Sequence, residues 1–470
     1  MAANIGPEAG ASDGVVVAAS SRGEWEDEPD YHFTWTRDSA LIISTFLPRF
    51  LPTAYLRSWA PSEALQDIQS AEEQEGEPDY LVEGLVRAYI ASQAAIQGVS
   101  NPSGDLWTGG LNEPKFHVDG SAFTGSWGRP QRDGPALRAL SLIPYANFLL
   151  DREYHTDIDY VSHHLYDPAK LRELGKVIKN DLEEVGGGWW NPGFDLWEEV
   201  DAHHLFTLLV SLRALQAGAN LASRLNDTGA ADFYLAQAAK IVHRLPDFWD
   251  DSRSYYRATL FDTPPETEQI RIGSFTRKER TSLDCAVPLA ILHAGDAAGG
   301  DWSAADDRIL GTLRAWVLSF DGVYGINKGR KWTEGWAVGR YAEDVYNGIG
   351  TSKGNPWFIC TFSVAEMLYR ARSIFEQQAG INVTDISAPF WSDVLGETVK
   401  PGPLESSELS MALEKLGVVG DAFLQAGTSR VTPDGRMSEQ IDRSDGAQVG
   451  ARDLTWSYAS FIAAIRARRT

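Results

Sequence analysis

The chain has 470 residues, and its 42 Lys and Arg against 65 Asp and Glu give a formal net charge of −23. This balance excludes the basic face that nucleic-acid binding needs, and it argues against attachment to anionic lipid by charge. The chain is also rich in rings, with 16 Trp, 16 Tyr and 19 Phe. Indole rings fill cores and also form platforms for flat apolar ligand faces. An acidic, Trp-rich chain is a first indication of a sugar-handling protein, although a large core accounts for most of the rings.

Cysteine is scarce, since only Cys285 and Cys360 occur. They lie far apart in apolar segments, which fits two buried thiols or a single bridge. No run of about 18 uncharged apolar residues occurs, so we expect no membrane span. The first residues lack the basic start and apolar centre of a signal peptide. Sequons at Asn226 and Asn382 would permit glycosylation on a secretory route.

Six segments are apolar nearly all round, as helices buried on every side are. The clearest are 205–215 (LFTLLVSLRAL) and 356–369, where we expect Asn355 to cap the helix and Pro356 to take its first position. The six buried helices are expected to begin near residues 37, 132, 202, 282, 356 and 453. More amphipathic helices are expected between them, at 80–96, 171–184, 231–245 and 303–318.

The alternation of buried and amphipathic helices predicts a layered all-α fold. Each helix must bury its apolar face against another layer, so the buried helices would form an inner ring and the amphipathic ones an outer ring. We therefore expect one domain over residues 1–470, an (α/α)6 barrel of six inner and six outer helices. A plain α-solenoid is the alternative, but the buried helices begin at unequal intervals, unlike the units of a repeat array.

The segments that precede the inner helices are rich in aromatic and charged residues. Inner helices of such a barrel run parallel, so these segments would meet at one end, where function tends to lie. The segments are 31–38, 124–133, 195–200, 338–346 and 438–445, with a weaker fourth member at 275–280. The sequence therefore predicts one site built from convergent loops.

Carboxylates in these loops suit glycoside hydrolysis, which needs a protonated acid at the leaving oxygen and a second carboxylate as base or nucleophile. Glu198 and Glu199 follow a Trp, and two adjacent carboxyls in a closed site would not both ionise readily, so one would have a raised pKa. Two solvated glutamates in a first helical turn are the simpler interpretation of this pair alone. Arg37 and Asp38 could together bind the hydroxyl groups of a ligand, or they could form an ion pair at the start of a helix.

Other chemistry finds little support in the sequence. The adjacent pairs His163–His164 and His203–His204 lack the spacing near four that chelation on a helix needs. No glycine-rich phosphate loop and no GxSxG elbow occurs. We expect no cofactor and no metal.

Five motifs in this order resemble the fungal glucoamylases of glycoside hydrolase family 15. They are the residues 31–39 (YHFTWTRDS), 125–139 (GSWGRPQRDGPALRA), 195–199 (DLWEE), 339–341 (GRY) with 355–357 (NPW), and 438–440 (SEQ) with 451–458 (ARDLTWSY). The resemblance covers nearly the whole chain. It implies an (α/α)6 barrel that releases β-D-glucose from the non-reducing ends of starch and related α-glucans with inversion.

The resemblance also implies the roles of individual residues. Glu198 would be the general acid and Glu439 the general base that activates water. Tyr31 would help to position that water. The terminal glucose would be held by Arg37, Asp38 and Arg340, and Glu199 would contact the next sugar. The residues implied to line the pocket are Trp35, Trp127, Trp197 and Trp456.

The chain departs from the family pattern in several ways. Its first residues do not resemble a signal peptide, although the family is usually secreted, and it has few cysteines. We expect no starch-binding domain after residue 470, so soluble substrate would be preferred over raw granules. The stretch 347–354 is looser than in filamentous fungi and closer to yeast members. We expect an extracellular monomer whose partner is an α-glucan or malto-oligosaccharide. A trehalase-like family 15 hydrolase and a non-catalytic carbohydrate-binding toroid are the alternatives.

Overall fold

The computed structural model describes residues 1–26, 28–51, 80–261, 271–272, 275–276, 282–295 and 302–469. The fourth of the convergent segments, at 275–280, lies largely outside the described residues, and no side chain of it is described. The other five segments are described in full.

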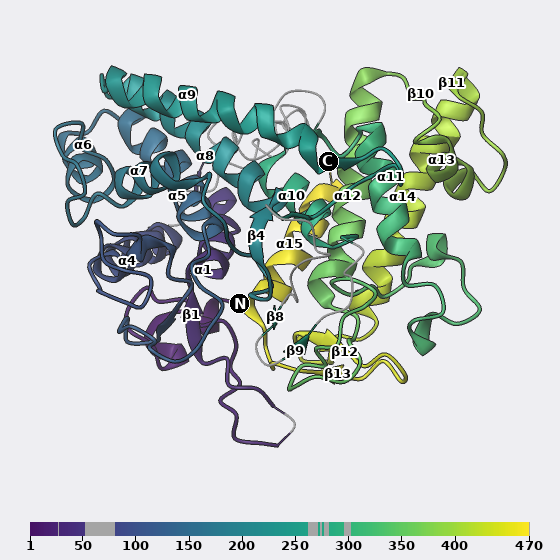
Figure 1. Cartoon of the computed structure of the whole chain (residues 1–470), viewed down its shortest axis with the longest axis horizontal. Coiled ribbons are helices and arrows are strands. Elements are labelled where there is room, and N and C mark those ends of the chain that lie inside the picture. Colours follow the sequence, from purple (N-terminus) through teal and green to yellow (C-terminus); the bar gives the residue numbers. More distant parts are fainter. Residues whose placement is uncertain are drawn as a thin grey trace.

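Six helices form a closed inner ring, because each contacts the next and the last contacts the first. They begin within four residues of the expected positions and are seen around the centre of Figure 1. They are α1 (Thr36–Ser44), α5 (Asp133–Asp151), α8 (Leu205–Arg224), α10 (Ala286–Ala294), α12 (Phe358–Gln378) and α15 (Thr455–Arg469). The expected (α/α)6 barrel is confirmed.

The outer layer alternates with this ring along the chain. Its described helices are α4 (Tyr80–Gln97), α7 (Val177–Gly188), α9 (Thr228–Arg244), α11 (Asp307–Leu318) and α14 (Ser406–Thr428), with the short α6 (His155–Tyr160) and α13 (Ala388–Leu395). In Figure 1, α9 runs along the outside of α8, and the two helices are in contact. Their mixed burial matches the amphipathic pattern of the sequence.

The start of α7 lies furthest from its predicted position, and the predicted cap of α12 is wrong. Helix α7 begins at Val177 instead of near residue 171, because Arg172 and Gly175 adopt left-handed backbone conformations (φ 51° and 85°) that end any helical run. Asn355 does not cap α12, whose N-cap is Trp357. The Asn355 side chain instead donates to the backbone oxygen of Asn347 and to the Gln440 side chain.

Short strands pin the loops that enter the ring. The antiparallel pairs are β1 (Phe33–Trp35) with β2 (Lys115–His117), β3 (Gly193–Phe194) with β4 (Asp201–His204), β4 with β7 (Thr259–Leu260), β5 (Trp249–Asp250) with β6 (Tyr255–Tyr256), β8 (Arg271–Ile272) with β9 (Phe275–Thr276), β10 (Asn382–Val383) with β11 (Gly402–Pro403), and β12 (Gln440–Ile441) with β13 (Gln448–Val449). Strands β1 and β4 lie directly before the inner helices α1 and α8. Strand β12 lies in the segment that leads to α15. They hold these approaches in fixed conformations.

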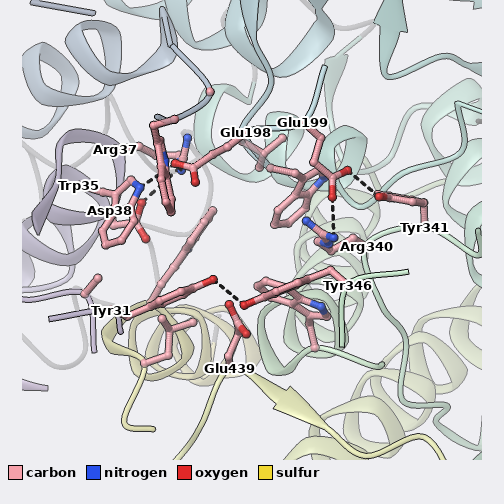
Figure 2. Close-up of a pocket in the computed structure, with 18 of the residues that line it drawn as sticks. Tyr31, Trp35, Arg37, Asp38, Glu198, Glu199, Arg340, Tyr341, Tyr346 and Glu439 are labelled. Atoms are coloured by element: carbon pink, nitrogen blue, oxygen red, sulfur yellow. Dashed lines mark hydrogen bonds and ion pairs between the residues drawn. The ribbon is translucent and has the colours of Figure 1, made fainter. Parts of the chain in front are cut away.

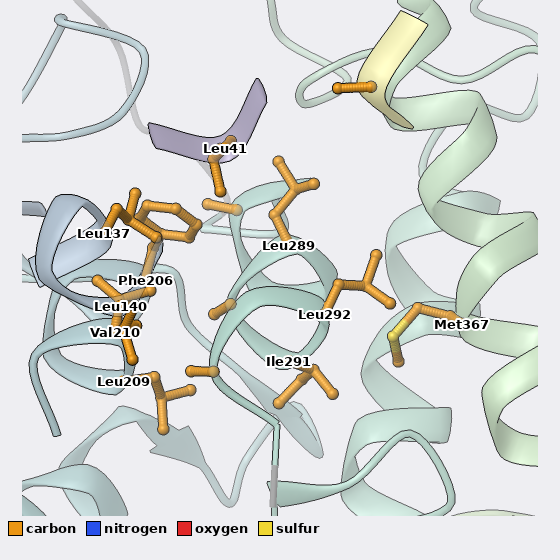
Figure 3. Close-up of a cluster of buried hydrophobic side chains, with 14 of the residues drawn as sticks. Leu41, Leu137, Leu140, Phe206, Leu209, Val210, Leu289, Ile291, Leu292 and Met367 are labelled. Carbon is orange, nitrogen blue, oxygen red and sulfur yellow. The ribbon is translucent and has the colours of Figure 1, made fainter. Parts of the chain in front are cut away.

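The core lies between the inner helices. Figure 3 shows buried side chains from α1, α5, α8, α10 and α12 that meet there: Leu41, Leu137, Leu140, Phe206, Leu209, Val210, Leu289, Ile291, Leu292 and Met367. Cys285 and Cys360 are buried free thiols. Helix α8 is long and apolar enough to cross a membrane by length and composition, but 83% of its apolar window is buried inside the barrel, as expected of a core helix.

Candidate active site

One cavity of about 610 Å³ opens where the convergent loops meet. Five of the six segments that precede inner helices contribute to its wall. All eleven residues expected at a site line it: Tyr31, Trp35, Arg37, Asp38, Trp127, Trp197, Glu198, Glu199, Arg340, Glu439 and Trp456. The segment before α10 contacts a residue of the cavity wall, since Asp284 accepts a 2.8 Å hydrogen bond from the indole nitrogen of Trp197.

Glu198 stands on one wall with its carboxylate held by two donors. Its Oε1 accepts hydrogen bonds from Trp35 Nε1 at 2.6 Å and from Gln131 Nε2 at 3.0 Å, and Arg37 Nη2 lies 4.0 Å away. The backbone of Glu198 is left-handed, with φ at 66°. Such a conformation is costly for a residue other than glycine and is typical of functional sites. The turn aims this carboxylate into the cavity (Figure 2).

Glu439 faces the cavity from the opposite side in Figure 2, at the approach to α15. Its side chain accepts a 3.0 Å hydrogen bond from Gln440 Nε2. Burial raises the pKa of Glu439 to about 8, although the positive charge of Arg340 and a hydrogen bond from Tyr31 act in the opposite direction. Two carboxyl groups from distant segments therefore share one cavity in different environments.

Glu199 points away from Glu198, toward the guanidinium of Arg340. Arg340 Nη2 donates to Glu199 at 2.8 Å and to Asp344 at 2.7 Å, and the Tyr341 hydroxyl donates to Glu199 at 2.5 Å. The turn therefore sends the side chains of the two adjacent glutamates to separate partners. A carboxyl of this cavity whose pKa is raised is that of Glu439.

Arg37 and Asp38 form the clamp-like part of the cavity. Arg37 Nη1 donates to Gln131 at 2.8 Å and to Asp133 at 3.0 Å, while its Nε lies 3.4 Å from Asp38 Oδ2. Within the described part of the chain, Asp38 Oδ2 has no hydrogen-bond donor. Burial raises the pKa of Asp38 to about 6. Asp38 lines the cavity, where a carboxyl group can accept a hydrogen bond from a ligand hydroxyl.

Aromatic rings complete the walls. Trp35 and Trp127 meet with centroids 6.0 Å apart, and Trp197 and Trp456 stack at 6.5 Å with an interplanar angle of 25°. Further lining residues to which the sequence analysis gave no role are Tyr341, Glu343, Tyr346, Trp357 and Leu454. Tyr341, Glu343 and Tyr346 lie in the convergent segment 338–346, whereas Trp357 and Leu454 lie in the family motifs 355–357 and 451–458, so the sequence contained a signal for all five.

The electrostatics of the cavity combine carboxylates with buried arginines. Among the described residues, no group of three or more His, Cys, Asp and Glu is arranged to hold a metal ion. What the cavity offers is a pair of opposed carboxyl groups, two arginines and flat apolar rings. This set suits acid–base chemistry on a polyhydroxylated, uncharged ligand.

Gly450 leaves room for the side chain of Glu439, because it has no Cβ. A Cβ at Gly450 would lie 2.7 Å from Glu439 Oε2, closer than real Cβ contacts. We expect Gly450→Ala to displace this carboxylate and to lower kcat about 10- to 100-fold with a smaller change in KM, since small misplacements of a reacting group have effects of this size. Steady-state kinetics on a malto-oligosaccharide, the substrate that the family resemblance implies, measure the effect.

Gly435→Ala is the matched control for this change. Gly435 has a similar left-handed backbone (φ 85° against 75°), but a Cβ there would meet nothing within 4 Å. Both substitutions carry a similar backbone strain, so only the contact with Glu439 distinguishes them. Equal kinetics in the two variants would contradict the positioning role of Gly450.

The buried carboxyl of Glu439 links stability to pH. Its pKa rises from the ordinary 4.5 to about 8 on folding, so its contribution to stability is complete below pH 4.5 and is lost as pH rises through 8. Glu439→Gln carries no such penalty. We expect its free energy of unfolding to exceed that of the wild type by an amount that grows between pH 4.5 and 8, to on the order of a few kcal/mol.

Chemical denaturation at a series of pH values measures this difference. The exposed Glu414 on α14 supplies the control, because Glu414→Gln should leave the pH dependence unchanged. A constant difference between Glu439→Gln and wild type across this range would show that Glu439 titrates alike in the folded and unfolded chains.

Comparison with known proteins identifies the family of the chain. The family model "Glycosyl hydrolases family 15" matches residues 1–466. A glucoamylase of Blastobotrys adeninivorans is 36% identical over 467 residues, which cover 98% of this chain and 68% of that protein. A probable glucoamylase of Schizosaccharomyces pombe is 34% identical, covering 97% of this chain and 85% of that protein.

Solved structures give the same result. The family 15 glucoamylase of Hypocrea jecorina superposes with a TM-score of 0.81 at 34% identity, covering 99% of this chain and 69% of that one. The glucoamylase of Saccharomycopsis fibuligera superposes with a TM-score of 0.79 at 29% identity, covering 99% of this chain and 92% of that one. The cavity with its two opposed carboxyl groups thus belongs to a chain that is a member of glycoside hydrolase family 15.

Proposed function

We propose that this chain is a glucoamylase, a glucan 1,4-α-glucosidase that removes glucose from the non-reducing ends of starch and malto-oligosaccharides. The observation that carries the proposal is the pair Glu198 and Glu439, on opposite sides of one cavity in a family 15 chain. The relatives named above are glucoamylases. The bonds cleaved are terminal α-1,4 linkages and, more slowly, α-1,6 linkages, and the product is β-D-glucose.

In the proposed reaction, Glu198 donates a proton to the glycosidic oxygen. Glu439 takes a proton from the water that attacks C1 from the opposite face of the sugar. The configuration at C1 is thereby inverted, which requires room for a water between the base and the sugar, with a carboxyl separation of about 6.5–9.5 Å. The hydroxyl of Tyr31, which hydrogen-bonds Tyr346 at 2.8 Å and acts on Glu439, helps to position this water.

The remaining lining residues bind the substrate. Arg37, Asp38 and Arg340 hold the hydroxyl groups of the terminal glucose, and their place in the cavity wall supports this role. Glu199, fixed by Arg340 and Tyr341, contacts the next sugar. Stacking platforms for the sugar rings are Trp35, Trp127, Trp197 and Trp456.

We further propose that residues 1–470 form one catalytic domain that acts as an extracellular monomer without cofactor or metal. The sequons support a secretory route, because Asn226 and Asn382 are both exposed. Secretion from a yeast host followed by enzymatic deglycosylation tests this. A mass unchanged by deglycosylation would contradict glycosylation at these positions.

Substrate assays test the activity. Rates on maltose, isomaltose and trehalose are compared, and the anomer first released is followed by proton NMR. We expect maltose to be cleaved fastest, isomaltose more slowly, and β-D-glucose to appear before mutarotation. A dominant rate on trehalose, or α-D-glucose as the first product, would overturn the proposal.

A further inference from the structure

The ammonium group of Lys115 is enclosed by four aromatic rings. Its Nζ lies 3.6 Å from the ring centroid of Trp127, 4.0 Å from Phe33, 4.4 Å from Phe123 and 4.7 Å from Trp35. The residue is 2% exposed. These distances fall within the range in which a cation is attracted by the face of a ring. We call Lys115 and these four residues the aromatic cage.

The fold builds this cage from three segments. In the β1–β2 ladder, Lys115 is the direct cross-strand partner of Trp35, and Phe33 lies two residues before Trp35 on the same face. Phe123 and Trp127 come from the approach to α5. The four rings form a closed cycle. The distance between ring centroids is 6.3 Å for Phe33–Trp35, 6.0 Å for Trp35–Trp127, 5.7 Å for Trp127–Phe123 and 5.4 Å for Phe123–Phe33.

Packing alone does not require a charge at this position. Four aromatic rings surround the Lys115 ammonium, and burial lowers the pKa of Lys115 to about 8. The charged groups that act on it are Glu198, Asp30 and Arg129. An apolar side chain would fill the same space without the cost of desolvating an ammonium group. A charge retained at such a cost beside an active site points to a function.

The cage connects directly to the proposed acid. Trp35 presents a ring face to the ammonium of Lys115, and its indole N–H donates the 2.6 Å hydrogen bond to Glu198. A cation on the face of an indole draws electron density from the ring, so the N–H becomes a stronger donor. The cation also holds Trp127, the second ring of the cage that lines the cavity.

We propose that Lys115 is a positioning residue for the general acid: held in the aromatic cage, it strengthens the hydrogen bond from Trp35 to Glu198 and fixes the Trp35–Trp127 wall. This inference rests on the proposed function. The other groups that face Glu198 are Gln131 and Arg37, and the charge of Glu198 acts on Asp38 and Tyr31. Lys115 is absent from the cavity wall, so it acts through Trp35.

Lys115→Met and Lys115→Arg test the proposal with two substrates. Maltose needs its leaving oxygen protonated, whereas α-D-glucosyl fluoride leaves with little help from an acid. We expect Lys115→Met to lower kcat on maltose about 10-fold or more, a part of the usual contribution of acid catalysis, and to change the fluoride rate by less than about threefold. Lys115→Arg keeps a cation on the rings and should recover most of the maltose rate.

The pH profile supplies a second readout. A lost positive charge favours the protonated carboxyl of Glu198, so the basic limb of kcat/KM on maltose should move to higher pH in Lys115→Met and stay in place in Lys115→Arg. Phe123→Leu, which opens the cage without removing the lysine or altering the cavity wall, should reduce the maltose-to-fluoride ratio in the same direction by a smaller factor. This variant carries the test if Lys115→Met does not fold.

The outcomes separate this inference from the proposed function. The role of Lys115 would be overturned if Lys115→Met lowered kcat equally on maltose and on α-D-glucosyl fluoride and left the basic limb of its kcat/KM profile in place. A wild-type ratio of the maltose rate to the fluoride rate in folded Phe123→Leu would overturn it as well. A wild-type protein that releases no glucose from maltose would overturn the proposed function itself, before any variant is compared.

Discussion

Glu198→Gln and Glu439→Gln are each expected to lower kcat on maltose by about 10²–10⁴-fold, the usual contribution of a positioned acid or base. Each change keeps the size of the side chain and removes the proton donor or acceptor that the reaction needs. Initial rates of glucose release, with folding verified by circular dichroism, measure the effect. A rate near that of wild type in either variant would reject the assignment of that residue.

The two variants should differ on α-D-glucosyl fluoride. Glu198→Gln lacks only the acid, so it should keep most of its fluoride hydrolysis, whereas Glu439→Gln lacks the base that both substrates need. The raised pKa of Glu439 is the feature that favours the exchanged roles, because a protonated carboxyl is what an acid requires. Fluoride hydrolysis that survives in Glu439→Gln and is lost in Glu198→Gln would establish that exchange.

Glu366→Gln is the control for these substitutions. Glu366 on α12 is a buried carboxylate that pairs with Arg370 and lies outside the cavity wall. Its replacement changes stability through the ion pair and leaves the reacting groups in place. The folded variant should therefore retain the wild-type kcat on both substrates.

Arg340→Leu is expected to have the largest effect on stability, about 3–5 kcal/mol, because it leaves buried carboxylates without their partner. The guanidinium is 3% exposed and donates to Glu199 and twice to Asp344, at 2.7–2.8 Å. It also lies within 5.4 Å of the ring centroids of Trp197 and Trp357. Urea denaturation measures the loss, and the same variant should show a raised KM.

An exposed ion pair supplies the comparison. Arg436 lies 2.8 Å from Asp434, but both side chains are more than half exposed. Arg436→Leu should change stability by less than about 1 kcal/mol, since exposed pairs contribute little. Similar losses in the two arginine variants would show that burial does not decide the contribution of Arg340.

The architecture could be predicted from local sequence. Helices that are apolar on every side, such as 205–224, have to lie between other helices, so the inner ring followed from composition and periodicity. The family motifs could be recognised because they are short and contiguous. The convergent loops could be located because parallel inner helices bring their starts to one end.

Helix starts and side-chain directions were harder to predict from the sequence. Asn355 suits a cap by residue type, but its amide is drawn to Asn347 and Gln440, which lie elsewhere in the chain. Glu198 and Glu199 are neighbours in sequence, yet the left-handed turn at Glu198 sends them to different partners. A local pattern does not contain these long-range competitors.

The sequence by itself determined the barrel, the loops that carry the site and the residue types that suit sugar chemistry, because all three depend on periodicity and on contiguous motifs. Only the tertiary structure decided the proton affinity of Glu439 and the enclosure of Lys115. Burial and the distances between charges set both properties, and they arise only when segments such as β1, β2 and the approach to α5 are brought together.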